Sequence, residues 1–268
     1  MFYQPKDIRK ALELKADLKE RGAFLAGGTD LVVLMNHGNA APENFIDLTH
    51  IPELRAIRRH NGTLELAGNV TYAQTGKLPI RCLARASLSV GGPGIRELGT
   101  IAGNLATASP AGDGSTALLA LDAEVELTSV RGTRRLPLEK FFLGYRKTAL
   151  AADEMITKVF IPTNYQTDWA KNGKRGAMNI SIVAAAVAIT PEKEIRIALA
   201  SVAATPIRCY QAEKFLARNG LGAASIREAA ETVRREIKPI TDHRASADYK
   251  VHLSGVMVRR VLESLVKA

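Results

Sequence analysis

The residues best suited to bind a ligand lie in a polar segment at Thr100–Asp113, which reads Thr-Ile-Ala-Gly-Asn-Leu-Ala-Thr-Ala-Ser-Pro-Ala-Gly-Asp. Gly103 and Gly112 permit backbone angles and close approaches that a side chain would prevent. Together with backbone N–H groups, the hydroxyl, amide and carboxyl groups of this segment could surround a phosphate or a ribose. The other interpretation is a long polar turn between two helices, and composition alone favours neither.

A second glycine-rich segment, Gly27–Asp30, follows an apolar stretch at 24–26 that predicts a short buried strand. An apolar helix is expected next, at 31–36. A strand, a glycine turn and a helix in that order place N–H groups and a helix dipole against an anion. Thr29 or Asp30 could instead cap the helix, and a cap can also face a ligand. An elongated ligand with a central pyrophosphate, such as a dinucleotide cofactor, could use both segments.

The composition is that of an ordinary globular protein, with 46% hydrophobic and 24% charged residues in 268. The sequence has no apolar run of about 18 residues and no signal-peptide pattern, so we expect a cytoplasmic protein without a membrane span. The net charge is +10, but the basic residues are scattered and aromatic residues make up only 5%. This distribution argues against a nucleic-acid surface built on base stacking.

Metal-binding patterns are missing from the sequence. Cys82 and Cys209 are the two cysteines and lie far apart, which is too few thiolates for an iron–sulfur cluster. The five histidines show no spacing typical of metal ligands. We therefore expect no metal site and no catalytic residue within this chain alone.

Periodicity and turn residues predict an α+β protein of two domains, 1–170 and 171–268. Between them, 164–175 is polar and is expected to be a connector or an edge loop. The predicted helices are 5–21, 31–36, a short one from Thr71, 83–90, 115–121, 207–218, 223–237 and 246–266. The predicted strands are 24–26, 44–48, 54–58, 64–67, 122–128, 134–137, 155–161, 178–189 and 194–203. An Asn61-Gly62 turn is expected to join two of these strands in a hairpin.

Five segments in matching order and spacing resemble one known family. They are Leu25–Leu31, Thr100–Asp113, Phe141–Thr148, Ala204–Cys209 and Arg244–Tyr249. The family is that of the FAD-binding medium subunits of molybdenum hydroxylases, which includes xanthine dehydrogenase and carbon monoxide dehydrogenase. The resemblance covers nearly the whole chain. It implies two N-terminal α/β subdomains clasping FAD (a PCMH-type FAD-binding fold), followed by an α+β domain like the C-terminal domain of the carbon monoxide dehydrogenase flavoprotein.

The resemblance also implies a set of cofactor-binding residues. Among them, the segment around Gly27 would contact the pyrophosphate, Lys171 would lie near the flavin, and Tyr145 would lie where a nicotinamide approaches. From the residues alone, Lys171 is an ordinary loop lysine, and Phe141, Phe142 and Tyr145 have the spacing of core residues. The full set is Leu25, Ala26, Gly27, Gly28, Thr29, Asp30, Leu31, Val90, Thr100, Ile101, Gly103, Asn104, Asp113, Tyr145, Ile156 and Lys171.

The function implied by the resemblance is electron transfer. FAD in this chain would accept electrons from the [2Fe–2S] centres of an iron–sulfur small subunit, fed in turn by a molybdopterin-binding large subunit. NAD or another acceptor would then take the electrons, within a heterotrimer or a dimer of heterotrimers. Two alternatives stay open: a free-standing FAD-dependent oxidoreductase, and a basic module that binds nucleic acid.

Overall fold

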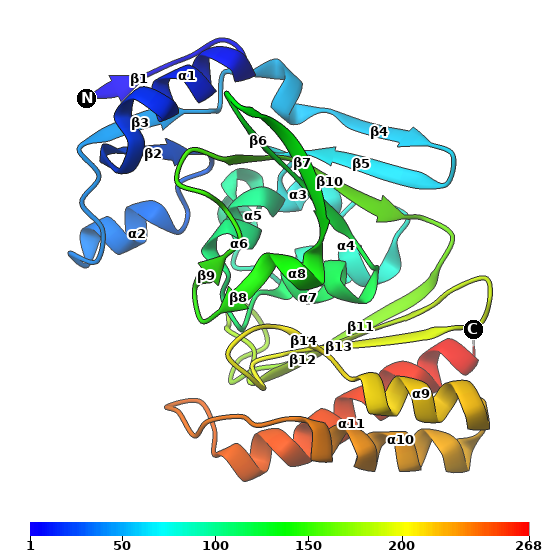
Figure 1. The fold of residues 1–268 in the computed structure, drawn as a ribbon. Helices are drawn as coiled ribbons and strands as arrows, with labels where there is room; N and C mark the ends of the chain where they lie inside the picture. The colour runs from blue at the N-terminus through cyan, green and yellow to red at the C-terminus, as the bar shows by residue number, and fades with distance from the viewer. Residues whose placement is uncertain (268) are drawn as a thin grey trace.

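A computed structural model describes residues 1–267 and folds them into an α+β protein built on four sheets. Figure 1 shows the N-terminal sheets in its upper part and a C-terminal sheet with three helices below. The elements up to the second glycine-rich segment are β1 (Phe2–Tyr3), α1 (Ile8–Leu18), η1 (Lys19–Arg21), β2 (Gly22–Leu25), α2 (Leu31–Asn36), β3 (Asn44–Asp47), η2 (Pro52–Arg55), β4 (Ile57–His60), β5 (Thr63–Ala67), α3 (Tyr72–Thr75), α4 (Arg81–Leu88) and α5 (Pro93–Leu98).

The second half of the chain contains the remaining strands of the large N-terminal sheet and the whole C-terminal layer. Its elements are α6 (Ile101–Thr107), α7 (Asp113–Ala120), β6 (Glu124–Ser129), β7 (Gly132–Pro137), α8 (Leu138–Phe141), β8 (Phe142–Gly144), β9 (Lys147–Thr148), β10 (Met155–Pro162), β11 (Gln166–Asn172), β12 (Val183–Ile189), β13 (Ile195–Ala200), β14 (Ile207–Arg208), α9 (Tyr210–Asn219), α10 (Ala223–Glu236) and α11 (Ala247–Val266).

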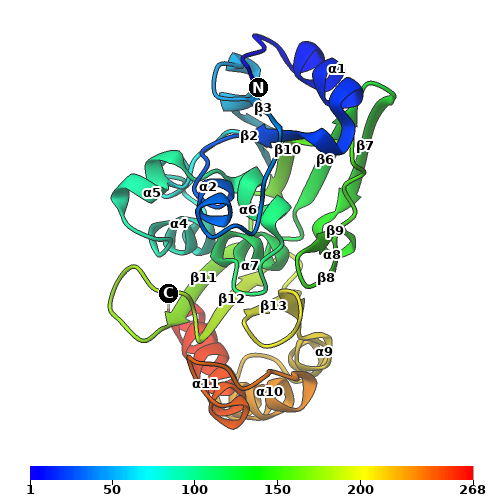
Figure 2. The same ribbon diagram turned by 90° about the vertical axis from the view of Figure 1, so that its left-hand side faces the viewer.

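The first sheet is parallel, in the order β1-β3-β2, and its strand β2 positions the first glycine-rich segment, which follows it in the chain. The chain leaves this sheet through its edge strand β2, and a short turn leads into α2. Figure 2 shows α2 in front of α6, and the Thr107 hydroxyl of α6 donates a hydrogen bond to Asp30, just before α2. The strand, glycine turn and helix expected from the sequence are therefore present, and they bring the turn against the second glycine-rich segment.

The second sheet is antiparallel, in the order β4-β5-β10-β6-β7. Its β4–β5 hairpin turns at Asn61 (φ 45°) and Gly62 (φ 77°), as the sequence predicts. Two positive φ angles match the twist of the flanking strands, which explains the Asn-Gly pair. Val125 and Leu127 on β6 are fully buried and alternate with half-buried glutamates, so one face of the sheet packs on the core.

The third main sheet, β11-β12-β13-β14, has both faces covered. Val183, Ala185 and Val187 of β12 belong to the core under α9, α10 and α11. Ala184 and Ala186, on the opposite face, belong to the core shared with α4 and α7. Alternate side chains point to opposite faces of a strand, so this one strand joins the two halves of the molecule. Its alanines let α7 approach closely.

The polar segment at 164–175 differs from the expected connector or edge loop, because residues 166–172 form strand β11. The domain division expected after residue 170 therefore falls within this strand. The strand tolerates polar residues because they are partnered: the carboxylate of Asp168, 2% exposed, accepts hydrogen bonds from Arg81 Nε at 3.1 Å and Ser264 Oγ at 2.6 Å. The buried residues of β11 are Thr167, Asp168 and Trp169, so the strand lacks the regular apolar alternation that predicts one.

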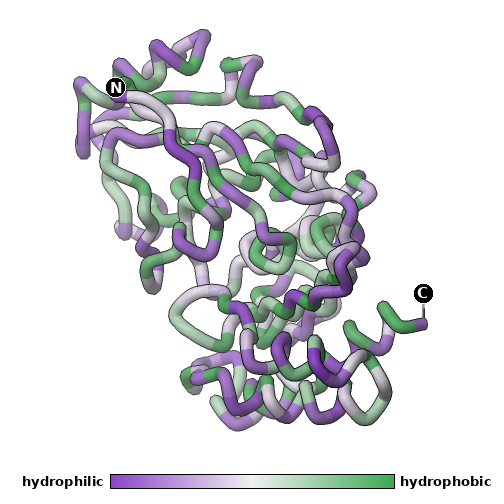
Figure 3. Tube along the Cα trace, turned by 45° about the vertical axis from the view of Figure 1, so that its right-hand side comes forward, coloured by the Kyte–Doolittle hydropathy of each residue, from purple (hydrophilic) through white to green (hydrophobic). Residues whose placement is uncertain are grey.

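The three C-terminal helices are amphipathic. In Figure 3 hydrophilic and hydrophobic residues alternate along them, as expected for helices with one face on a core. Leu253, Val258 and Leu262 of α11 are among the residues that pack against the sheet. Among residues 1–267, no helix combines the length and apolarity needed to cross a bilayer.

Candidate functional site

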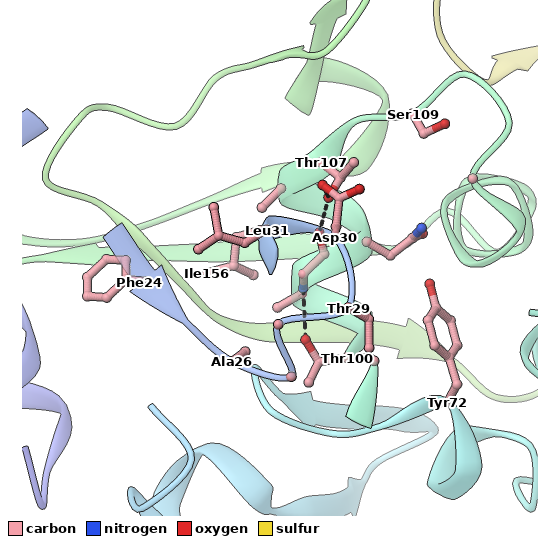
Figure 4. A pocket seen from close by; sticks show the side chains of 18 of the residues that line it. Phe24, Ala26, Thr29, Asp30, Leu31, Tyr72, Thr100, Thr107, Ser109 and Ile156 are labelled. Atoms are coloured by element: carbon pink, nitrogen blue, oxygen red, sulfur yellow. Dashed lines mark hydrogen bonds between the residues drawn. The ribbon is translucent and has the colours of Figure 1, made fainter. Parts of the chain in front are cut away.

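A cavity of about 770 Å³ lies between the two glycine-rich segments and strand β10. This volume falls within the range of small-molecule and cofactor pockets, about 300–1,000 Å³. Figure 4 shows side chains from several elements converging on it. One wall is apolar and is formed by Phe24, Leu25, Leu31, Leu34, Leu48, Leu54, Leu150, Met155 and Ile156.

The first glycine-rich segment supplies a tight turn on the cavity wall. Gly28 has φ +69°, and its carbonyl accepts the N–H of Val32 at 3.0 Å, which starts helix α2. Gly27 packs so closely against the end of helix α5, just before the second glycine-rich segment, that a β-carbon there would lie 1.7 Å from the Leu98 carbonyl oxygen. Successive N–H groups in such a turn form a concavity that suits an anion. Glycine is therefore needed at position 28 for its positive φ and at position 27 because a β-carbon has no room there.

The second glycine-rich segment is helical over half its length, which differs from the loop or long turn considered above. Thr100 caps helix α6, its Oγ1 accepting the Gly103 N–H at 3.0 Å. Ile101 and Leu105, one turn apart, are buried in the core, and this burial stabilises the helix despite the glycine. Ala108, with φ 47°, ends the helix, and the chain then loops to the first residue of α7, Asp113.

Side-chain hydrogen bonds hold the segments together. Thr107 Oγ1 donates to Asp30 Oδ2 at 3.0 Å, a bond drawn in Figure 4, and it also contacts the Gly103 carbonyl at 2.9 Å. Asn104 Oδ1 accepts from the N–H and the hydroxyl of Ser115, at 3.0 and 2.8 Å. Both bonds use the carbonyl oxygen of Asn104, so its NH₂ group is the end available to a ligand.

Asp113 is buried in the cavity wall and forms an ion pair with Lys171 of β11. Lys171 Nζ lies 2.5 Å from Asp113 Oδ2 and 3.2 Å from the Ser89 carbonyl oxygen. The other carboxylate oxygen, Oδ1, is buried without a hydrogen-bond partner among residues 1–267. Burial raises the pKa of Asp113, and the nearby Lys171 charge offsets only part of that rise. A partner for Oδ1 would therefore have to come from a ligand or a water molecule.

Most of the residues predicted to bind a cofactor line this one cavity. Three do not: Ile101 is turned into the core, Tyr145 is 63% exposed at the β8–β9 turn, and Lys171 lies behind Asp113. Phe141 is fully buried, as the core interpretation predicted. The predicted residues on the cavity wall are Leu25, Ala26, Gly27, Gly28, Thr29, Asp30, Leu31, Val90, Thr100, Gly103, Asn104, Asp113 and Ile156. Their contact with a cofactor stays a prediction.

Sequence reasoning missed other residues on the wall, notably Tyr72, Met155 and Arg146. Tyr72 arrives there because Thr71 pairs with Thr100 across an isolated bridge, a contact between distant segments. No local pattern indicates such a bridge. Arg146, with φ 51°, directly follows the predicted Tyr145, and the arginine rather than the tyrosine lines the cavity.

Comparisons with known proteins cover both halves of the chain. Residues 1–164 match the family model described as the FAD binding domain in molybdopterin dehydrogenase. Residues 170–265 match the model of the CO dehydrogenase flavoprotein C-terminal domain. The α+β fold implied by the resemblance is confirmed by these two matches.

Individual relatives are similar to this chain over nearly its full length. The xanthine dehydrogenase FAD-binding subunit of Escherichia coli O157:H7 is 29% identical over 283 residues, covering 100% of this chain and 96% of the relative. The carbon monoxide dehydrogenase medium chain of Hydrogenophaga pseudoflava is 31% identical over 274 residues, covering 98% and 96%. A solved structure of carbon monoxide dehydrogenase from that organism, lacking the Mo-pyranopterin moiety, superposes with a TM-score of 0.93 at 29% identity, covering 99% of this chain and 96% of that one.

These matches agree with the geometry of the cavity, whose glycine turn and apolar wall suit a dinucleotide with a flat ring system. They confirm the resemblance found in the sequence. This chain belongs to the family that carries the FAD binding domain in molybdopterin dehydrogenase, and FAD is its cofactor.

Proposed function

We propose that this chain is the electron-transfer subunit of a molybdenum hydroxylase complex. It would receive electrons from the [2Fe–2S] centres of a small subunit and pass them to NAD or another acceptor. The relatives are named as an FAD-binding subunit and a medium chain, which supports a role within a larger assembly. The observation that carries the proposal is the cavity, where two segments distant in sequence meet around one continuous space.

The cavity residues divide the binding of FAD among them. We assign the pyrophosphate to the turn at Gly27–Asp30, whose N–H groups offset negative charge at little entropic cost. The Asn104 amide and the Asp113 carboxylate are assigned polar contacts, and Val90 and Ile156 are assigned apolar contacts with the flavin. Bound FAD supplies the redox chemistry, accepting electrons from one partner and releasing them to another. The protein orients the ring and sets its electrostatic surroundings.

Two further predicted residues act from outside the cavity in this proposal. Lys171 places a positive charge behind Asp113, which would favour added negative charge on the flavin. Tyr145, exposed beside the cavity residue Arg146, would meet an incoming acceptor. Ile101 would support the second glycine-rich segment from the core rather than touch FAD.

The two cysteines of this chain are poorly suited to bind an iron–sulfur cluster, which supports a role for partner subunits. Cys82 and Cys209 are both buried, and burial raises the pKa of each, to about 12 for Cys82. Such thiols stay protonated and are poor ligands for iron. Within residues 1–267 no group of three or more His, Cys, Asp or Glu side chains is placed to hold a metal ion. We therefore assign the clusters and the molybdopterin to separate subunits, in a heterotrimer or a dimer of heterotrimers.

Affinity purification of the tagged full chain from its native cells tests this proposal. We expect a yellow-brown complex of this chain with two further chains. FAD should be bound to this chain, and the complex should also show [2Fe–2S] absorption and contain molybdopterin. Purification of the chain alone with FAD, and with turnover of its own substrate, would instead support a free-standing oxidoreductase. A colourless chain that binds nucleic acid with a steep salt dependence would replace both interpretations with a nucleic-acid module.

A further inference from the structure

The Tyr72 hydroxyl is an unpartnered polar group on the cavity wall. Tyr72 is 4% exposed, and its hydroxyl makes no hydrogen bond with any other described residue of the chain. Leaving a buried hydroxyl without a partner costs about 1–3 kcal/mol. Phenylalanine would fill the same space without that cost. The hydroxyl therefore calls for a partner that the chain itself does not supply.

The tyrosine stands where the proposed FAD contacts converge. Its N–H donates to the Gly99 carbonyl at 3.0 Å, and its ring edge and Thr29 Oγ1 each lie 3.2 Å from the position of a β-carbon on Gly99. At the other end, its oxygen lies 3.3 Å from the β-carbon position of Gly114, which is also 3.1 Å from Asn104 Oδ1. Figure 4 shows the ring beside Thr29, with the hydroxyl at the far end from its own backbone.

The surroundings decide whether this hydroxyl donates or accepts. Burial and the nearby Asp113 carboxylate both raise the pKa of Tyr72 well above its usual value, so the phenol stays protonated at neutral pH. A protonated phenol next to the first turn of α7, where helix N–H groups favour negative charge, is suited to an oxygen acceptor.

We propose that the Tyr72 hydroxyl donates a hydrogen bond to an oxygen of bound FAD and is a cofactor-binding residue. This inference rests on the proposed function, because it takes FAD to occupy the cavity. The acceptor oxygen belongs either to the ADP half or to the FMN half of the cofactor. Both offer the same chemistry to the phenol.

Tyr72→Phe tests the inference in the full chain freed of FAD. One hydrogen bond corresponds to about a fivefold change in Kd, so we expect FAD, followed by quenching of its fluorescence, to bind about fivefold more weakly. Thermal unfolding of the FAD-free variant should be unchanged or shifted upward, because the orphan hydroxyl is gone. Tyr249→Phe, at an exposed position on α11, is the matched control.

The outcomes separate this inference from the proposed function. Equal FAD affinity of Tyr72→Phe and wild type overturns the inference alone, whereas wild type that fails to bind FAD overturns the proposed function. A lower unfolding temperature without FAD, at unchanged affinity, identifies a purely structural hydroxyl and also overturns the inference. Repeating the titrations with ADP and with FMN locates the acceptor, since only the half that receives the bond should lose affinity.

Discussion

Lys171 and Asp113 join the C-terminal sheet to the cavity wall. Lys171 Nζ lies 2.5 Å from Asp113 Oδ2, and the side chains are only 9% and 7% exposed. One residue belongs to β11 and the other begins α7, so a single ion pair couples the packing of the two halves to the shape of the cavity. Removing one partner of a buried pair leaves an uncompensated charge, which is far costlier than losing a surface salt bridge.

Lys171→Gln should therefore destabilise the FAD-free chain by about 3 kcal/mol at neutral pH, measured by urea unfolding. Lys214→Gln, which removes the same charge from an exposed site on α9, is the control and should have little effect. Equal unfolding midpoints for the two variants would contradict the importance of the buried pair.

The same variant should show a distinctive dependence on pH. Burial already raises the pKa of Asp113 above its ordinary value of 3.8, and loss of Lys171 removes the main opposing influence. A carboxyl with a raised pKa in the folded state binds its proton more readily there than in the unfolded chain. The stability of Lys171→Gln should thus fall as the pH rises above 3.8 through the folded-state pKa. A destabilisation that is constant with pH would count against a charged, buried Asp113.

Gly27→Ala should push the first glycine-rich segment away from the end of α5, which leads into the second segment. The added β-carbon would lie 1.7 Å from a backbone oxygen, which cannot move aside as a flexible side chain can. We expect FAD to bind about tenfold more weakly or worse. Gly94→Ala is the matched control, because nothing lies within 4 Å of the new methyl group and alanine favours its helix, α5. Similar FAD affinities for the two variants would refute the role given to Gly27.

Thr107→Val should weaken the link between the two glycine-rich segments without leaving an empty space in the packing. It keeps the side-chain volume but removes the hydrogen bond to Asp30 Oδ2, which ties α6 to the first glycine turn. We expect a loss of about 1 kcal/mol in stability and about threefold to tenfold weaker FAD binding. Thr133→Val, on the exposed strand β7, controls for the general effect of the change. An unaltered FAD affinity would mean that the turn holds its shape without this bond.

Asp242→Asn should destabilise the C-terminal half by about 3 kcal/mol. Lys250, whose side chain is 1% exposed, would lose the carboxylate 2.9 Å from its Nζ. Burial alone would raise the pKa of Asp242, but hydrogen bonds from Arg244 and Lys250 outweigh it and hold that pKa far below 3.8. The stabilisation is therefore complete above pH 3.8 and is lost as the pH falls through the folded-state pKa.

Acid unfolding measured by circular dichroism checks this prediction. Wild type should lose stability below pH 3.8 faster than Asp242→Asn does, so that the two stabilities converge at low pH. Asp17→Asn, at an exposed position on α1, should follow wild type throughout. A constant gap between wild type and Asp242→Asn would contradict the assigned charge state.

Local patterns predicted much of this fold and part of the site. Helix α2 begins and ends as expected, because an apolar run follows a glycine turn and ends before polar residues. Strand β11 was missed because its buried Asp168 is stabilised by Arg81 and Arg85 of α4, a contact that local periodicity does not report. Ile101 was placed in the site by its position in the motif, but its spacing with Leu105 turns it to the core.

The contacts that shape the cavity connect residues far apart in the chain. The resemblance assigned Asp113 to the cofactor and Lys171 to the surroundings of the flavin separately, and their ion pair appears only in the folded chain. Tyr72 has no signal in its own segment, since its position depends on the bridge between Thr71 and Thr100. Such contacts follow from tertiary packing, which single-sequence periodicity does not report.

A titration of the purified, FAD-free chain with FAD, followed by visible absorption after removal of unbound cofactor, tests whether the cavity binds the cofactor. We predict one bound FAD per chain, with shifted flavin bands in wild type and in Gly94→Ala, and markedly weaker retention in Gly27→Ala. Wild-type chain that stays colourless after excess FAD is added and removed would contradict the assignment of this cavity to the cofactor.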